Sequence, residues 1–98
     1  MLTYEAAKTV EGSAFTIQAG TGPTLPLTLV EVRLGRSRTP PPGLPQPFSL
    51  YLKGTPRVMC PQGTYVLENQ TLGRLEVFVV PVGDDPETGE FLYQVIFN

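Results

Sequence analysis

The last third of the chain, residues 63–98, is made almost entirely of segments that predict β-strands. Three segments there are rich in β-branched and aromatic residues: 64–67, 72–82 and 91–97. Three more come earlier, at residues 14–18, 25–34 and 48–53, and glycine or proline clusters separate them. Short strands with such turns between them predict an all-β domain, a small six-stranded antiparallel barrel or sandwich. The length of 98 residues fits one domain, 1–98.

The first twelve residues depart from the strand pattern. Thr3 is a suitable N-cap for a short helix over residues 4–10, and Gly12 follows its end. Leu2, Ala6 and Val10 would share one face of that helix. An irregular arm is the alternative for residues 1–12.

The alternation of apolar residues changes phase within residues 25–34. Leu25, Leu27 and Leu29 alternate first, and Val30, Val32 and Leu34 then follow on the other phase. A β-bulge or a barrel corner would produce such a switch. Pro26 lacks an N–H group, so its end of the strand is expected at an edge or a bulge.

Residues 35–47 form a long proline-rich loop. Its prolines fix φ and favour an extended, stiff conformation. Pro42 and Pro45 have the spacing of a minimal polyproline ligand, with Leu44 between them. The segment either wraps the edge of its own domain or becomes ordered against a partner.

The last two strands are apolar on both faces. Leu75, Val77 and Val79 share one face of residues 72–82, and Phe78 and Val80 share the other. Strands buried on both faces lie in a sheet that is covered twice, so the helix, the proline-rich loop or another subunit is expected to supply the second cover. Only 16% of the residues are charged, below the usual quarter or so, which suits either a partly covered surface or a surface rich in Thr, Gln, Ser and Pro. The expected core residues are Phe48, Tyr65, Leu67, Phe78, Tyr93 and Phe97.

The composition argues against several classes of function. Seven basic and nine acidic residues give a net charge of −2, unlike the basic excess of nucleic-acid binders. The chain has no histidine and a single cysteine, Cys60, so no group activates that thiol and no intramolecular disulfide can form. We therefore expect no enzyme activity and no cofactor or metal, with Cys60 a half-buried thiol.

The sequence shows no signal peptide, and its longest apolar run, residues 77–82, is too short to cross a bilayer. We therefore expect no membrane insertion and synthesis in the cytoplasm. Incorporation into a virion-like or extracellular assembly stays open.

Two charged clusters are candidate sites. The acidic cluster consists of Asp84, Asp85, Glu87 and Glu90. We interpret it as the solvated tip of a hairpin. The alternatives are a weak cation site or a pair of catalytic carboxylates. The basic cluster at residues 33–38 either forms solvated ion pairs or contacts a partner.

Several motifs carry a family resemblance: residues 27–32, 48–54, 61–69, 72–73, 77–83 and 93–98. On these motifs the chain resembles a family of small all-β bacterial proteins of unknown function, of about 100 residues, associated with genes for phage-tail-collar-like and appendage proteins. The resemblance implies a non-enzymatic structural role and carries over no catalytic residues.

Our primary hypothesis is an assembly module that self-associates or docks on a phage-tail-like or fibre-like protein. The alternative is a small-ligand or glycan-binding barrel, with its site between the proline-rich loop and Tyr51, which alternation places on the outer face. The candidate partner-binding residues are Arg33, Arg36, Arg38, Pro42, Leu44, Pro45 and Tyr51.

Overall fold

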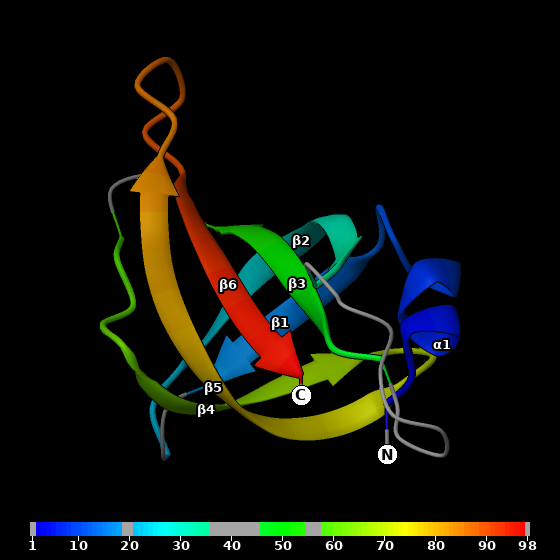
Figure 1. The fold of residues 1–98 in the computed structure, drawn as a ribbon. Coiled ribbons are helices and arrows are strands. Elements are labelled where there is room, and N and C mark those ends of the chain that lie inside the picture. The colour runs from blue at the N-terminus through cyan, green and yellow to red at the C-terminus, as the bar shows by residue number, and fades with distance from the viewer. Residues whose placement is uncertain (1, 19–20, 36–45, 55–57, 98) are drawn as a thin grey trace.

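The structure is a computed structural model that describes residues 2–18, 21–35, 46–54 and 58–97. Within these residues a short helix precedes six strands, which form a closed antiparallel barrel (Figure 1). The prediction of a six-stranded barrel with one N-terminal helix is therefore confirmed, and the barrel rather than the sandwich is the observed form. The elements are α1 (Tyr4–Thr9), β1 (Ala14–Gln18), β2 (Thr24–Leu34), β3 (Phe48–Gly54), β4 (Gly63–Asn69), β5 (Gly73–Asp84) and β6 (Phe91–Phe97).

The strands follow the order β1-β2-β3-β6-β5-β4 around the barrel, and β4 pairs with β1 to close it. β1, β2 and β3 pair in sequence, and β4 returns to lie beside β1, which is a Greek-key arrangement. β4, β5 and β6 then pair in sequence, and β6 completes the circuit against β3. All of these pairings are antiparallel.

Alternate residues of each strand fill the barrel. On β3 the pattern is regular, since Leu50 and Leu52 are fully buried while Ser49 and Tyr51 are half-buried on the outer face. Burying a leucine or phenylalanine side chain contributes roughly 1.5–3 kcal/mol. The largest side chains with almost no exposure are Phe15, Ile17, Leu29, Leu50, Leu52, Leu67, Val79, Tyr93 and Val95.

Two of the expected core residues need correction. Phe78 is 52% exposed because Val77 and Val79 beside it point into the barrel, so alternation turns Phe78 outward. Phe97 is only partly buried and stacks on the ring of Phe48, with the centroids 5.0 Å apart. The other four expected core residues are buried.

The N-terminal helix does not supply the second cover that was expected for the last two strands, and cover by the proline-rich loop or by another subunit stays a prediction. A closed barrel has one inner face, so a second apolar face on the same strand must lie outside. Among the described elements, β5 packs mainly against β4 and β6, and α1 lies against β2 instead. Figure 1 shows α1 at the side of the barrel, away from the outer face of β5.

β2 contains the predicted bulge. Its register with β3 shifts between Leu29 and Glu31, which confirms the change of phase seen in the sequence. Val30 and Leu34 are exposed, and only Val32 of the second phase is buried. Pro26 lies beyond the ladder with β3, which begins at Leu27, so the missing N–H group interrupts no bond there.

The helix begins as predicted, since the Thr3 hydroxyl accepts a hydrogen bond from the Ala6 N–H group at 3.1 Å. Its buried face differs from the predicted one, because Ala7 and Val10 are buried and Ala6 is only partly so. The helix ends at Thr9, so the four-residue spacing from Ala6 to Val10 does not continue along a regular helical face.

Two loop regions also bear on the predictions. The Gly35 N–H group donates to the Pro47 carbonyl at 2.9 Å, so these residues close the base of the proline-rich loop. At the β4–β5 turn, Gly73 has φ +77°, a conformation that glycine adopts readily, whereas Gly63 begins strand β4 and is not among the glycines with positive φ.

Candidate interaction face

Side chains from four strands form two rows on the outside of the barrel. One row runs from Arg33 on β2 across Ser49 on β3 to Ile96 on β6. The next row runs from Glu31 across Tyr51 and Gln94 to Val80 on β5, and Phe78 lies two residues before Val80 on the same face. We call this surface the outer-face patch: Glu31, Arg33, Ser49, Tyr51, Phe78, Val80, Gln94 and Ile96.

Arg33 is held in place at one edge of the patch. Its Nε donates to a Glu31 carboxylate oxygen at 2.7 Å and its Nη2 donates to the other oxygen at 3.0 Å. The guanidinium carbon also lies 4.9 Å from the centre of the Tyr51 ring, a cation–π distance. The hydrogen bond from Arg33 lowers the pKa of Glu31, and the same bond raises the pKa of Arg33. Both groups are exposed, so this pair orients Arg33 more than it stabilises the fold.

Tyr51 is fixed at its hydroxyl as well as at its ring. The Gln94 side-chain amide donates to the Tyr51 hydroxyl at 3.0 Å, and it also approaches the Ser49 hydroxyl at 3.4 Å. The prediction that Tyr51 faces outward is confirmed, since it is half-buried while Leu50 and Leu52 on either side of it are buried. The structure thus brings together two of the candidate partner-binding residues, Arg33 and Tyr51.

The apolar part of the patch was not identified from the sequence. Ile96 is 56% exposed and Phe78 is 52% exposed, on neighbouring strands. The alternation of β6 contained the signal for Ile96, because its buried residues, Tyr93 and Val95, lie on the other phase. Phe78 was misassigned to the core, since nothing in one sequence states which apolar face of a strand points inward.

The remaining candidate partner-binding residues lie outside the described residues. They are Arg36, Arg38, Pro42, Leu44 and Pro45. Their predicted role in binding a partner therefore stays a prediction.

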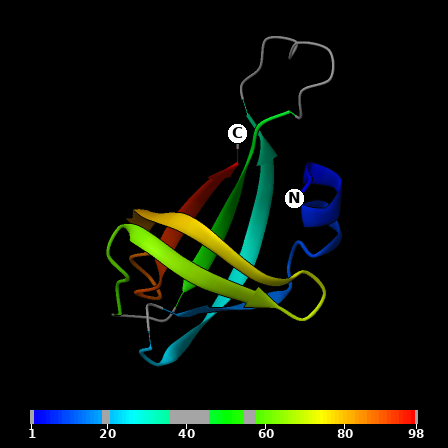
Figure 2. The same ribbon diagram turned by 90° about the horizontal axis from the view of Figure 1, so that it is seen from below.

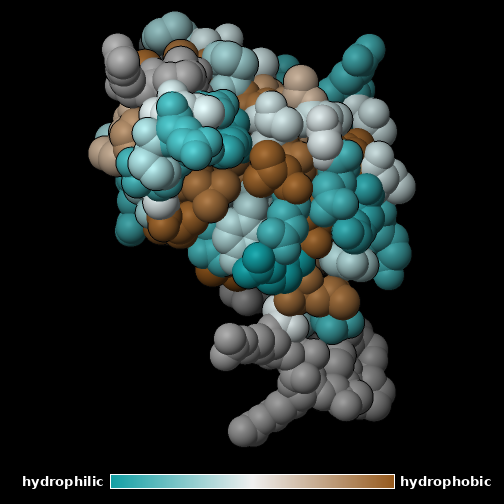
Figure 3. All heavy atoms as spheres, turned by 90° about the horizontal axis from the view of Figure 1, so that it is seen from above, coloured by the Kyte–Doolittle hydropathy of each residue, from teal (hydrophilic) through white to brown (hydrophobic). Residues whose placement is uncertain are grey.

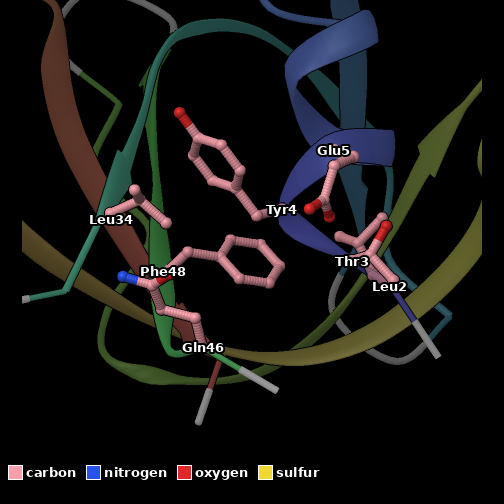
Figure 4. A pocket seen from close by; sticks show the side chains of 7 residues that line it. All are labelled: Leu2, Thr3, Tyr4, Glu5, Leu34, Gln46 and Phe48. Atoms are coloured by element: carbon pink, nitrogen blue, oxygen red, sulfur yellow. The ribbon is translucent and has the colours of Figure 1, made fainter. Parts of the chain in front are cut away.

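A groove lies beside the base of the proline-rich loop. It has a volume of about 420 Å³ and lies between the start of α1 and the facing ends of β2 and β3. Figure 4 shows Tyr4 and Phe48 side by side in it; their rings meet edge to face with centroids 6.2 Å apart. Tyr51 does not line this groove, so the groove and the outer-face patch are separate features. The lining residues are Leu2, Thr3, Tyr4, Glu5, Leu34, Gln46 and Phe48.

The acidic hairpin loop is tied to the barrel by one carboxylate. Asp85 accepts a hydrogen bond from the Lys53 ammonium at 3.0 Å and another from the Glu87 N–H group at 2.9 Å. These bonds, chiefly the one from Lys53, lower the pKa of Asp85. Asp84 and Glu87 point into solvent, and the described residues contain no group of three or more acidic, cysteine or histidine side chains placed to hold a metal ion.

Cys60 is more buried than predicted, at 8% exposure, because Tyr93 fixes the segment that carries it. The Cys60 N–H group donates to the Tyr93 hydroxyl at 2.9 Å, and that hydroxyl donates to the Val58 carbonyl at 3.3 Å. Tyr65 donates to the Pro61 carbonyl at 2.6 Å. The prediction that Tyr65 and Tyr93 lie in the core is confirmed. Burial raises the pKa of both tyrosines, so both stay neutral donors.

Polar and apolar side chains alternate over the end of the barrel from which the β5–β6 hairpin projects. Figure 3 shows apolar atoms there in several groups divided by polar ones. No helix among the described residues is both long and apolar enough to cross a lipid bilayer.

No curated protein and no solved structure matched the chain. A family model described as "Domain of unknown function (DUF6916)" matches residues 2–97, which is nearly the whole chain. The chain therefore belongs to the DUF6916 family, a family of domains of unknown function.

Proposed function

We propose that this chain is a non-enzymatic assembly module of a bacterial protein, which associates through the outer-face patch with copies of itself or with a tail-like or fibre-like protein. One observation carries the proposal: Ile96 and Phe78 are more than half exposed on neighbouring strands, beside an ordered tyrosine and arginine. Tyrosine, arginine and large apolar side chains are the residues enriched at the centres of protein interfaces.

The order of the patch supports the same proposal. Gln94 and Arg33 hold Tyr51 from two sides, so a partner would meet a side chain that has already lost much of its freedom. Less conformational entropy is then lost on binding. The low fraction of charged residues, 16%, also suits a domain with part of its surface covered. The resemblance to proteins associated with phage-tail-collar-like and appendage genes supports a tail-like or fibre-like partner.

Light scattering across a concentration series tests self-association. We expect the apparent mass of the wild-type protein to rise with concentration, and the variants Ile96→Lys and Phe78→Lys to stay monomeric. Met59→Lys is a matched control, because Met59 is 51% exposed but lies outside the patch. A wild-type protein that stays monomeric at the highest concentration would contradict self-association, and equal loss in the Met59 variant would contradict the role of the patch.

The groove beside α1 supports a second candidate function, binding of a small ligand or a glycan. Its volume of about 420 Å³ lies in the range of ligand sites, and the Tyr4 and Phe48 rings provide an apolar wall. Titration calorimetry with a panel of oligosaccharides tests it. The groove would have to bind at least one of them, and Tyr4→Ala would have to remove that binding while Tyr51→Ala leaves it unchanged.

A further inference from the structure

β5 changes its pairing partner halfway along its length. Residues 73–79 pair with β4, and the ladder with β6 is formed by residues 80–84. β6 leaves β5 after Gln94 and continues against β3 alone. Figures 1 and 2 show the resulting shape, in which β5 and β6 are close at the hairpin end and diverge at the other. Among the described residues, the edge of β5 over residues 73–79 that faces away from β4 has no strand beside it.

Side chains cap the comparable open edges elsewhere in the barrel. Where β2 extends past β1, the Glu11 carboxylate accepts the Val32 N–H group at 2.7 Å. Where β1 extends past β4, the Asn69 amide donates to the Ala14 carbonyl at 3.0 Å. Within the described part of the chain no side chain caps residues 73–79 in this way. An uncapped edge is a template on which another strand can pair.

We propose that a second copy of this chain adds its own β5 to this edge, in antiparallel orientation and with Leu75 opposite Leu75 of the second copy. The proposal rests on the self-association proposed above and names the contact that forms it. The edge adjoins the outer-face patch at Phe78, so one contact would also cover part of that patch.

The sequence of β5 is complementary to itself in this register. Arg74 and Glu76 are both exposed on the outer face, and each would lie opposite the other on both sides of the two-fold axis. Neither of them takes part in the ion pairs formed by the described residues, although Arg74 lies opposite Glu68 on β4. The four kinds of opposing pair would be Leu72 with Phe78, Gly73 with Val77, Arg74 with Glu76, and Leu75 with Leu75.

The neighbouring registers lose this complementarity. Only those registers are relevant in which outward-facing residues of one copy lie opposite outward-facing residues of the other. A register shifted by one residue would place inward-facing residues opposite outward-facing ones. Centring the pair on Glu76 places two carboxylates opposite each other, and centring it on Arg74 does the same with two guanidinium groups. Centring it on Val77 places Glu76 opposite Phe78. The charges of β5 therefore favour the register centred on Leu75.

Sedimentation velocity with charge variants tests the register. Arg74→Glu and Glu76→Arg each convert both opposite-charge pairs into like-charge pairs, so each variant alone should associate about tenfold more weakly than the wild type, or more. Mixing the two single variants should restore association as a heterodimer, because each acidic edge then meets a basic one. The double variant, which swaps the two charges, should associate like the wild type. Both side chains are exposed, so circular dichroism should show an unchanged fold for every variant.

The outcomes separate this inference from the proposed function. Single variants that associate as the wild type does, or a mixture that fails to restore association, would overturn the β5 contact. If the β5 contact were overturned in this way but Ile96→Lys still abolished association, the proposed function would stand without the β5 contact. A wild-type protein that stayed monomeric throughout would overturn both the contact and self-association.

Discussion

The hydroxyl of Tyr93 joins the segment before β4 to the barrel core, and removing it should destabilise the fold measurably. Tyr93 is 1% exposed, and its hydroxyl accepts the buried N–H group of Cys60 at 2.9 Å. Tyr93→Phe keeps the ring and leaves that N–H group without its acceptor. A buried donor left unsatisfied costs about 1–3 kcal/mol. The Val58 carbonyl loses its bond too, but Val58 is 42% exposed and water can replace the hydroxyl.

We therefore expect Tyr93→Phe to lower the free energy of unfolding by roughly 2 kcal/mol. For a domain of this size each kcal/mol lowers Tm by about 4–8 °C, so the melting temperature should fall by about 8–16 °C. Urea unfolding followed by circular dichroism measures the change directly, and the slope with urea concentration should be the same in both proteins.

Tyr51→Phe is the matched control, because it removes a hydroxyl that accepts one bond on the outer face. Its loss should cost about 0.5 kcal/mol or less, since water can bond to the released Gln94 amide. Equal unfolding free energies for the Tyr93 and Tyr51 variants would refute the view that the Tyr93 hydroxyl fastens the segment around Cys60 to the core.

Two further predictions follow from the backbone and the charges. Gly73 has φ +77°, so Gly73→Ala should cost about 1–2 kcal/mol of stability. Gly63→Ala should be close to neutral, because the atom nearest to the added Cβ is 3.7 Å away. Thermal melts that show Gly63→Ala to be the less stable variant would contradict this. The pKa of Asp85 lies below its ordinary value of 3.8, chiefly because of the Lys53 hydrogen bond. A carboxylate whose pKa is lowered in the folded protein stabilises the fold at pH values above its ordinary pKa, and this stabilisation is lost as the pH falls through its pKa in the folded protein. Asp85→Asn should therefore have a lower melting temperature than the wild type at neutral pH. The difference in melting temperature should disappear in acid. A gap that persists well below pH 3.8 would show that the Asp85 carboxylate is not its source.

The strand pattern of the sequence predicted most of the fold. Alternation located the strands, and the phase switch after Leu29 located the bulge of β2. These signals are local, since a strand with one buried face repeats every two residues and a bulge adds one residue to that count. The N-cap at Thr3 was predictable for the same reason, because its partner is only three residues away.

The side of the strand that faces inward was not predictable where both sides are apolar. On β5 both Val77 and Phe78 fit an interior, and the pairing of β4, β5 and β6 determines that Val77 is the buried one. The same holds for the patch, whose members come from four strands and meet only through the pairing of β2 with β3, β3 with β6 and β6 with β5. The ion pair of Arg33 with Glu31 could be expected because the two residues are only two positions apart, but the stacking of Arg33 on Tyr51 depends on the β2–β3 register.

The barrel closes because its two longest strands exchange partners, and each exchange leaves an edge that must be satisfied. β2 has 11 residues and β5 has 12, and each pairs with one neighbour in its first part and with another in its second. At β2 the chain resolves the problem internally, because the turn after α1 delivers Glu11 to the Val32 N–H group and the helix buries Ala7 and Val10 beside it. At β5 the described residues provide no equivalent, and the outer face there carries an alternating charge pair and an exposed phenylalanine. The open edge of β2 thus finds its partner within the chain, whereas the open edge of β5 finds none among the described residues. We therefore expect the second copy to bind at β5.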